Sequence, residues 1–138
     1  MFEGACLCGK IRYAVDGDIG EVSHCHCSMC RRVHGAAFGT YCAVPKENFR
    51  WLSGSEFVKL YRSSDTLDRT FCSNCGSTLQ AILESEPDVI YLTLGKTNDD
   101  PQCRPSMHIF VGSKAPWYEI TDDLPQYETW TYESEAQE

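Results

Sequence analysis

Cys72-Ser73-Asn74-Cys75-Gly76 decides the fold together with Cys6-Leu7-Cys8-Gly9 near the N-terminus. In the first stretch, a tight turn followed by glycine forms a knuckle that aims two sulfurs at one ion, because glycine can take backbone shapes closed to other residues. For the second stretch we expect an extended strand, in which side chains at positions i and i+2 project from the same face. The two pairs together predict a four-sulfur metal site that ties the N-terminus to the middle of the chain.

A third cluster, Cys25-His26-Cys27-Ser28-Met29-Cys30, adds three more sulfurs. Thiolates suit zinc, whose structural sites have four protein ligands and whose catalytic sites have three and one open position. Seven sulfurs therefore predict two zinc ions per chain. The structural zinc is predicted on Cys6, Cys8, Cys72 and Cys75, and the second, open zinc on Cys25, Cys27 and Cys30.

Other assignments of these cysteines stay open at this point. The four-cysteine set could instead form disulfides or hold an iron–sulfur cluster. A fourth protein ligand could close the three-cysteine set; the candidates are His24, His26, His34, Cys42, Cys103 and His108. We expect His26 to point away from the metal because it stands between two ligands, and Cys42 to be a buried thiol because its neighbours are apolar.

Two arginines, Arg31 and Arg32, directly follow the last cysteine of the third cluster. A zinc ion with three thiolates carries a net charge of −1, which basic neighbours would offset. Alternatively, one arginine could hold a substrate carboxylate by a bidentate contact. We therefore name both as candidate substrate-binding residues.

The composition is that of one globular domain with 138 residues, 42% of them hydrophobic, and a formal net charge of −8. Negative charge disfavours binding to nucleic acid and to anionic membranes. We expect a cytoplasmic protein because no stretch approaches the ~20 apolar residues of a membrane helix, and the first residues do not resemble a signal peptide. A single domain is predicted over residues 1–130, followed by a frayed acidic tail over residues 131–138.

Hydrophobic periodicity predicts a mainly β fold of short antiparallel strands with little helix. Apolar residues alternate with other residues over 11–15 and 90–94, as in strands. Further strands are predicted over residues 21–24, 37–44, 57–62, 68–71, 78–83 and 108–111, separated by turn-rich segments. Only residues 28–34 predict a helix, of about two turns.

These motifs resemble those of one known family, the glutathione-dependent formaldehyde-activating enzymes, which includes centromere protein V. The resemblance is carried by Gly4-Ala5-Cys6-Leu7-Cys8-Gly9-Lys10-Ile11-Arg12-Tyr13, His24-Cys25-His26-Cys27-Ser28-Met29-Cys30-Arg31-Arg32 and Phe71-Cys72-Ser73-Asn74-Cys75-Gly76. It continues through Pro105-Ser106-Met107-His108-Ile109-Phe110, Ala115-Pro116-Trp117 and Leu124-Pro125-Gln126-Tyr127, and so spans roughly residues 4 to 127.

The resemblance implies a zinc-stabilised β-tent fold with the two zinc sites named above. It also implies a carbon–sulfur lyase activity that joins formaldehyde to glutathione to give S-hydroxymethylglutathione, with Cys25, Cys27 and Cys30 as the catalytic zinc site. The glutathione sulfur would occupy the open position and lose its proton there. The alternative function is a non-catalytic, zinc-stabilised thiol carrier or protein-binding module. Chromatin or microtubule association, by analogy with centromere protein V, fits poorly with an acidic tail.

Overall fold

The computed structural model describes residues 1–130, so the predicted tail over residues 131–138 lies outside the described residues. The described part is mainly β and contains one short α-helix, which confirms the predicted fold class. Its contacts divide it into two units. Unit 1 comprises residues 1–20 and 42–103, and the described part of unit 2 comprises residues 21–41 and 104–130. The single domain over residues 1–130 stays a prediction.

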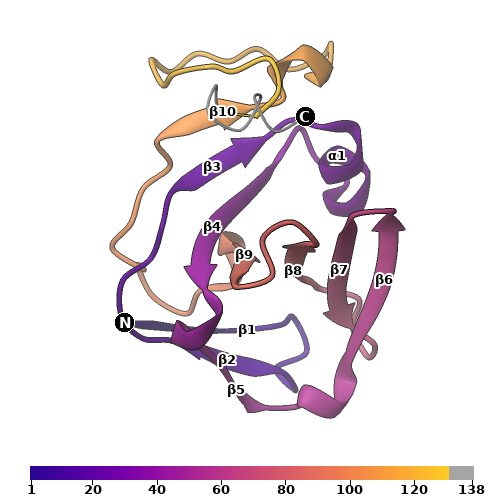
Figure 1. Cartoon of the computed structure of the whole chain (residues 1–138), viewed down its shortest axis with the longest axis vertical. Helices are drawn as coiled ribbons and strands as arrows, with labels where there is room; N and C mark the ends of the chain where they lie inside the picture. Colours follow the sequence, from indigo (N-terminus) through magenta and orange to yellow (C-terminus); the bar gives the residue numbers. More distant parts are fainter. Residues whose placement is uncertain (131–138) are drawn as a thin grey trace. The chain divides into compact units, whose positions relative to one another are not determined.

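Unit 1 contains a three-stranded antiparallel sheet and most of a larger sheet (Figure 1). The small sheet has the order β1-β2-β5, with β1 at Phe2–Ala5, β2 at Arg12–Val15 and β5 at Phe49–Ser53. The larger set has the order β4-β9-β8-β7-β6, with β4 at Gly39–Pro45, β9 at Val89–Thr93, β8 at Thr78–Leu83, β7 at Leu67–Cys72 and β6 at Val58–Ser64. Residues 42–45 of β4 belong to this unit.

Two predicted ligand cysteines lie in the core of unit 1. Cys6, Ile11, Cys72 and Leu79 form one buried cluster, each at most 5% exposed. Trp51, Phe57, Val58 and Cys75 are partly buried and pack against it. The cysteine knuckles and the hydrophobic core are therefore parts of one packed structure, so a change at either affects both.

Unit 2 contains β3 (Val22–Cys25), β10 (Met107–Ile109), residues 39–41 of β4 and the helix α1 (Ser28–His34). Figure 1 shows β10 beside β3, and the two strands pair in parallel, with His108 opposite His24. α1 starts after Cys27 and ends at Gly35, which takes the left-handed conformation (φ 61°) and donates its N–H to the carbonyl oxygen of Arg31. Glycine at this position is a common helix terminator.

The elements agree with the sequence predictions where the pattern was strong. The helix over 28–34 and the strand over 78–83 have the predicted bounds. β1 and β5 were not predicted, since β1 contains Glu3 and Gly4 and the end of β5 resembles a turn. The prediction of antiparallel strands was wrong for β10 and β3, which pair in parallel because a long segment of chain connects them.

Gly54 is the glycine whose replacement the fold of unit 1 tolerates least. It has a φ of 74°, and a Cβ there would lie 2.0 Å from the carbonyl oxygen of Lys10. Gly54→Ala is expected to lower the free energy of unfolding by more than about 2 kcal/mol, from left-handed strain and the backbone clash together. Urea denaturation measures this change. Gly35→Ala, with a similar φ but open space around it, should cost only about 1 kcal/mol; equal losses would contradict the clash.

Candidate metal centres

The first candidate metal centre lies in unit 1 and is formed by the four predicted cysteines. The sulfur atoms of Cys6, Cys8, Cys72 and Cys75 all lie within 4.8 Å of one another. The Cys8 sulfur is 3.5 Å from that of Cys6 and 3.9 Å from that of Cys72. A tetrahedron with zinc–sulfur bonds of about 2.3 Å has edges of about 3.8 Å, so the spacing fits a zinc ion.

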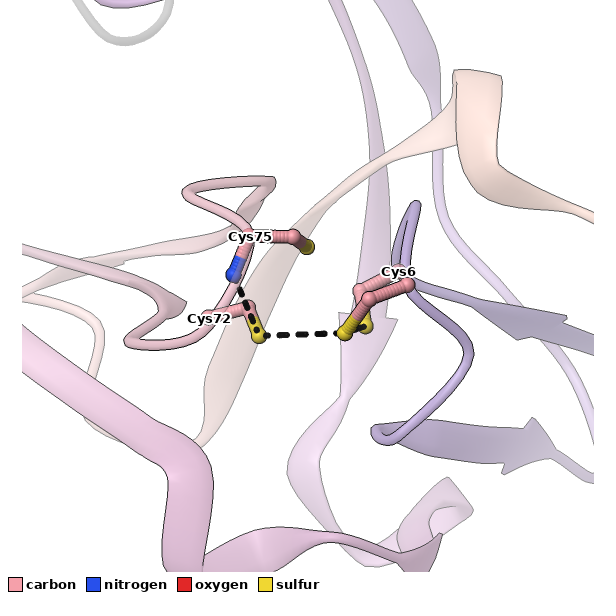
Figure 2. Close-up of side chains that lie close together, drawn as sticks. Cys6, Cys72 and Cys75 are labelled. Carbon is pink, nitrogen blue, oxygen red and sulfur yellow. Dashed lines mark hydrogen bonds between the residues drawn. The ribbon is translucent and has the colours of Figure 1, made fainter.

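The four sulfurs lie on two tight turns, and each turn carries one pair of cysteines. Figure 2 shows Cys72 and Cys75 on one turn, facing Cys6 on the other. The prediction of an extended strand at Cys6–Cys8 was wrong. β1 ends at Ala5, and the Gly9 N–H donates to the Cys6 carbonyl oxygen (3.1 Å), so Cys6–Cys8 lie in a turn. A turn can bring the two sulfurs together just as a strand can. Gly9 and Gly76 both have a φ of 80°, as a knuckle glycine requires.

Backbone N–H groups in both turns point at sulfur. Ile11 donates its N–H to the Cys6 sulfur, and Asn74 and Cys75 donate theirs to the Cys72 sulfur. The nitrogen–sulfur distance is 3.4 Å in each case. Such hydrogen bonds favour the thiolate over the thiol. The turns are therefore arranged for ionised sulfur, which is the form that binds a metal.

The pKa values of the thiols differ with their surroundings. Burial raises the pKa of Cys75, but hydrogen bonds with the side chain and backbone of Ser77 outweigh it and lower the pKa to about 5. A hydrogen bond with the Asn74 side chain lowers the pKa of Cys8. Burial raises the pKa of Cys72 to about 11. Full ionisation of the set therefore requires positive charge close to the Cys72 sulfur.

Lys96 is a neighbour of this centre that the sequence analysis did not single out. Its ammonium group donates to the carbonyl oxygens of Thr93 (3.0 Å) and Leu79 (3.4 Å), and its charge interacts with Cys6. Burial lowers its pKa to about 7, whereas Cys6 acts in the opposite direction. A zinc ion with four thiolates carries a charge of −2, which this partly buried lysine would partly offset.

The second candidate metal centre lies in unit 2 and is formed by Cys25, Cys27 and Cys30. Their sulfur atoms lie within 4.8 Å of one another. Cys25 ends β3, Cys27 is the residue before α1, and Cys30 is buried in the first turn of that helix. The Cys27 sulfur accepts the N–H of Cys30 over 3.2 Å. A strand end and a helix start thus bring together three sulfurs from six consecutive residues.

Crowding of thiols dominates the chemistry of the second centre. Hydrogen bonds with Cys27 and Cys30, and then burial, raise the pKa of Cys25 far above its ordinary value. The three groups therefore cannot ionise together without a cation among them. Arg31 and Arg32 follow in α1, where the Arg31 Nε donates to the Ser113 carbonyl oxygen over 3.1 Å and Arg32 is exposed.

The residues considered as a fourth ligand have other places in the structure. Within residues 1–130, the group of possible metal ligands in unit 2 consists of these three cysteines and includes no other histidine, cysteine or carboxylate. The His24 ring bonds to the Thr40 hydroxyl and the His34 ring to the Tyr41 hydroxyl, both over 2.8 Å. His26 bonds to His108 over 2.8 Å. Cys42 is fully buried, as predicted, and interacts with Cys103.

Comparison with known proteins identifies the family. The family profile described as glutathione-dependent formaldehyde-activating enzyme matches residues 1–113. The chain belongs to this family. It is also 26% identical over 127 residues to a Halomonas elongata protein named as a candidate glutathione-dependent formaldehyde-activating enzyme, covering 87% of this chain and 81% of that one.

Two further comparisons concern part of the chain and the fold. An uncharacterized lyase of Schizosaccharomyces pombe is 36% identical over 78 residues, which are 56% of this chain and only 55% of the yeast protein. The crystal structure of a Rhodobacter sphaeroides protein matches with a TM-score of 0.58 and 24% identity, covering 72% of this chain and 92% of that one, and supports the fold alone. No helix within residues 1–130 is long and apolar enough to span a membrane.

The geometry of unit 1 predicts that Cys72→Ser removes one metal ion and destabilises the protein. We expect zinc per chain to fall by one and the free energy of unfolding to fall by more than about 3 kcal/mol, since structural zinc contributes on the order of 10 kcal/mol to folding. Elemental analysis and urea denaturation measure both. Cys42→Ala, which also removes a fully buried thiol, should leave the zinc content unchanged and cost about 1 kcal/mol. Unchanged zinc in Cys72→Ser would refute this centre.

Proposed function

We propose that this protein is a zinc-dependent carbon–sulfur lyase that joins glutathione and formaldehyde to S-hydroxymethylglutathione. In this reaction the glutathione sulfur bonds to the formaldehyde carbon, and the thiol proton ends on the former carbonyl oxygen, so nothing is oxidised or reduced. The observation that carries the proposal is the three-sulfur set of Cys25, Cys27 and Cys30, which has no fourth protein ligand within residues 1–130. Family membership and the name of the Halomonas elongata relative support the choice of substrates.

In this proposal the two centres have different roles. Cys6, Cys8, Cys72 and Cys75 would hold a structural zinc inside a β-tent fold, and Cys25, Cys27 and Cys30 would hold the catalytic one. When bound, the second zinc would lower the pKa of a coordinated thiol and polarise an aldehyde oxygen. The chain itself contributes a rigid three-sulfur frame, set by the end of β3 and the first turn of α1.

Arg31 and Arg32 are the proposed substrate-binding residues of this site. Glutathione carries two carboxylates, and a guanidinium group binds a carboxylate by two parallel hydrogen bonds. The Nε of Arg31 is engaged by the Ser113 carbonyl oxygen, which orients the guanidinium group and leaves its two terminal nitrogens to contact a ligand. Arg32 is exposed on the same helix.

The alternative function is a zinc-stabilised thiol carrier or protein-binding module without turnover. It shares both metal centres with the enzyme and differs in whether the bound thiol reacts. The enzyme is favoured because three sulfurs in one six-residue segment leave coordination positions for a substrate, whereas a purely structural centre uses four protein ligands.

Replacement of Cys25 separates these functions. Cys25→Ser is expected to abolish the catalysed formation of S-hydroxymethylglutathione, with a decrease in kcat/KM of more than about 100-fold, because one of three ligands to the reactive metal is lost. The rate above the spontaneous addition of thiol to formaldehyde is measured by exchange NMR. The melting temperature should change little, since the core of unit 1 is untouched. A large fall in melting temperature together with unchanged activity would mean a structural second centre.

Glutathione is also expected to change the metal environment. X-ray absorption at the zinc edge should report an average of about 3.5 sulfur ligands per zinc in protein with two ions, rising to about 4 as glutathione is added. The Cys72→Ser variant supplies the matched control, because its remaining zinc would be the open one and its sulfur count should rise from about 3 to about 4. If adding glutathione leaves the number of sulfur ligands per zinc unchanged in both proteins, the result would contradict an open thiol site.

A further inference from the structure

Unit 1 contains a cavity of about 360 Å³ that is lined by residues of both its sheets. The small sheet contributes Phe49 and Trp51 of β5, whose rings pack edge to face with centroids 4.7 Å apart. The larger sheet contributes Gln80 and Ile82 of β8 and Ile90 of β9. Among residues 1–130, no predicted ligand cysteine lines this cavity. The proposed reaction therefore does not use it.

Strand geometry explains why these side chains line the same cavity. Residues i and i+2 of a strand project from the same face, so Phe49 and Trp51 share one face of β5. Gln80 of β8 lies opposite Leu92 of β9, and directly opposite residues share a face of the sheet. Ile90, two residues before Leu92, thus lies on the same face as Gln80. The lining is therefore mainly aromatic and aliphatic.

Gln80 brings a hydrogen-bond donor into this apolar lining. The residue is only 4% exposed. Its Oε1 accepts the hydroxyl group of Thr70 over 3.1 Å, whereas its NH2 group has no hydrogen-bond partner among residues 1–130. A buried amide donor costs stability unless water or a ligand accepts its hydrogen bonds. Because Gln80 lines the cavity, its NH2 group is a donor for a molecule bound there.

The charged residues of the lining are both cationic. Arg50 forms an ion pair with Asp16, so its charge is already offset. Lys46 is exposed and forms no ion pair with another described residue. Within residues 1–130 no carboxylate lines the cavity itself, although Glu47 and Asp88 line a neighbouring cavity that Lys46 also borders. The unpaired ammonium group of Lys46 therefore favours an anion in the cavity.

We propose that this cavity binds a small aromatic carboxylate. The ring packs against Trp51 and Phe49, because aromatic pairs gain energy beyond the area that they bury. The carboxylate accepts hydrogen bonds from the NH2 group of Gln80 and is attracted by the ammonium group of Lys46. Mainly apolar walls with a few polar groups are typical of small-molecule sites. This site is independent of the reaction proposed for the sulfur group of unit 2.

Benzoate is the probe for this site, added to the zinc-loaded protein. Nitrogen-15 NMR follows the indole N–H signals of the three tryptophans, Trp51, Trp117 and Trp130. We expect the Trp51 signal to shift with a Kd in the millimolar range, as for a ligand of about ten heavy atoms. Trp117, which is 70% exposed, should not respond. No shift of Trp51, or an equal shift of Trp117, would overturn the proposed site.

A neutral probe and charge variants test the preference for a carboxylate. Benzamide, with the same ring and no charge, should bind about 2- to 5-fold more weakly than benzoate, the range for an exposed ion pair. Lys46→Gln should remove this difference. The matched control Lys59→Gln, which replaces an exposed lysine outside the lining, should keep it. Equal binding of both probes to the native protein, or equal effects of the two substitutions, would overturn the assignment of a carboxylate.

Replacement of Gln80 tests the buried donor. Gln80→Met should weaken the binding of benzoate about 5-fold or more, because a hydrogen bond to a charged group is lost. The melting temperature of each variant checks its fold. Because Lys46 is exposed, the substitution Lys46→Gln should leave the fold intact, so the site remains testable if Gln80→Met does not fold. Unchanged affinity in folded Gln80→Met would overturn the role of the amide.

A last variant separates this cavity from the metal centres, since a carboxylate can also bind zinc. Cys25→Ser removes a ligand of the proposed open zinc in unit 2. The shift of the Trp51 signal should persist in this variant with an unchanged Kd for benzoate. Loss of the shift would assign benzoate to the metal and overturn the cavity site. The activity of the native protein, measured separately, decides the proposed function whatever benzoate does.

Discussion

Mutual repulsion between closely spaced thiolates is the constraint on which much of this structure depends. Within each of the two groups, every sulfur lies within 4.8 Å of the others, a range over which like charges strongly oppose ionisation. In unit 1 the same sulfurs belong to the hydrophobic core, with Cys6 and Cys72 packed against Ile11 and Leu79. A cation among the sulfurs would therefore remove the repulsion and complete the packing in a single event, so that metal binding and folding of unit 1 are coupled.

The two sulfur groups differ in how the chain assembles them, and this difference suits different roles. The group in unit 1 joins turns that are more than 60 residues apart, and it can cross-link the fold only if both turns supply ligands. The group in unit 2 comes from one local segment and cross-links nothing distant. A local three-sulfur frame adds little to stability as a cross-link, so the proposed open metal site suits this group better than a purely structural role does.

The two groups of cysteines could be predicted from the sequence because cysteine spacing carries both geometry and chemistry. The grouping of Cys6 and Cys8 with Cys72 and Cys75 follows from ligand counting alone, and the structure brings these sulfurs together. The local conformation was harder to predict, since both a strand and a turn place the sulfurs of a Cys-x-Cys pair together. The position of Lys96 was not predictable, because only the folded chain shows that this partly buried ammonium group interacts with Cys6.

The histidine chain shows what sequence spacing cannot reveal. His26 and His108 are 82 residues apart, and they meet because β10 pairs in parallel with β3 and places His108 opposite His24. Asp122 then reaches His108 from the segment that follows. The expectation that His26 points away from the metal does not foresee its hydrogen bond to His108. Here two buried rings and an exposed carboxylate from three separate segments form one hydrogen-bonded chain, and the parallel pairing of β10 with β3 is what brings the two histidines together.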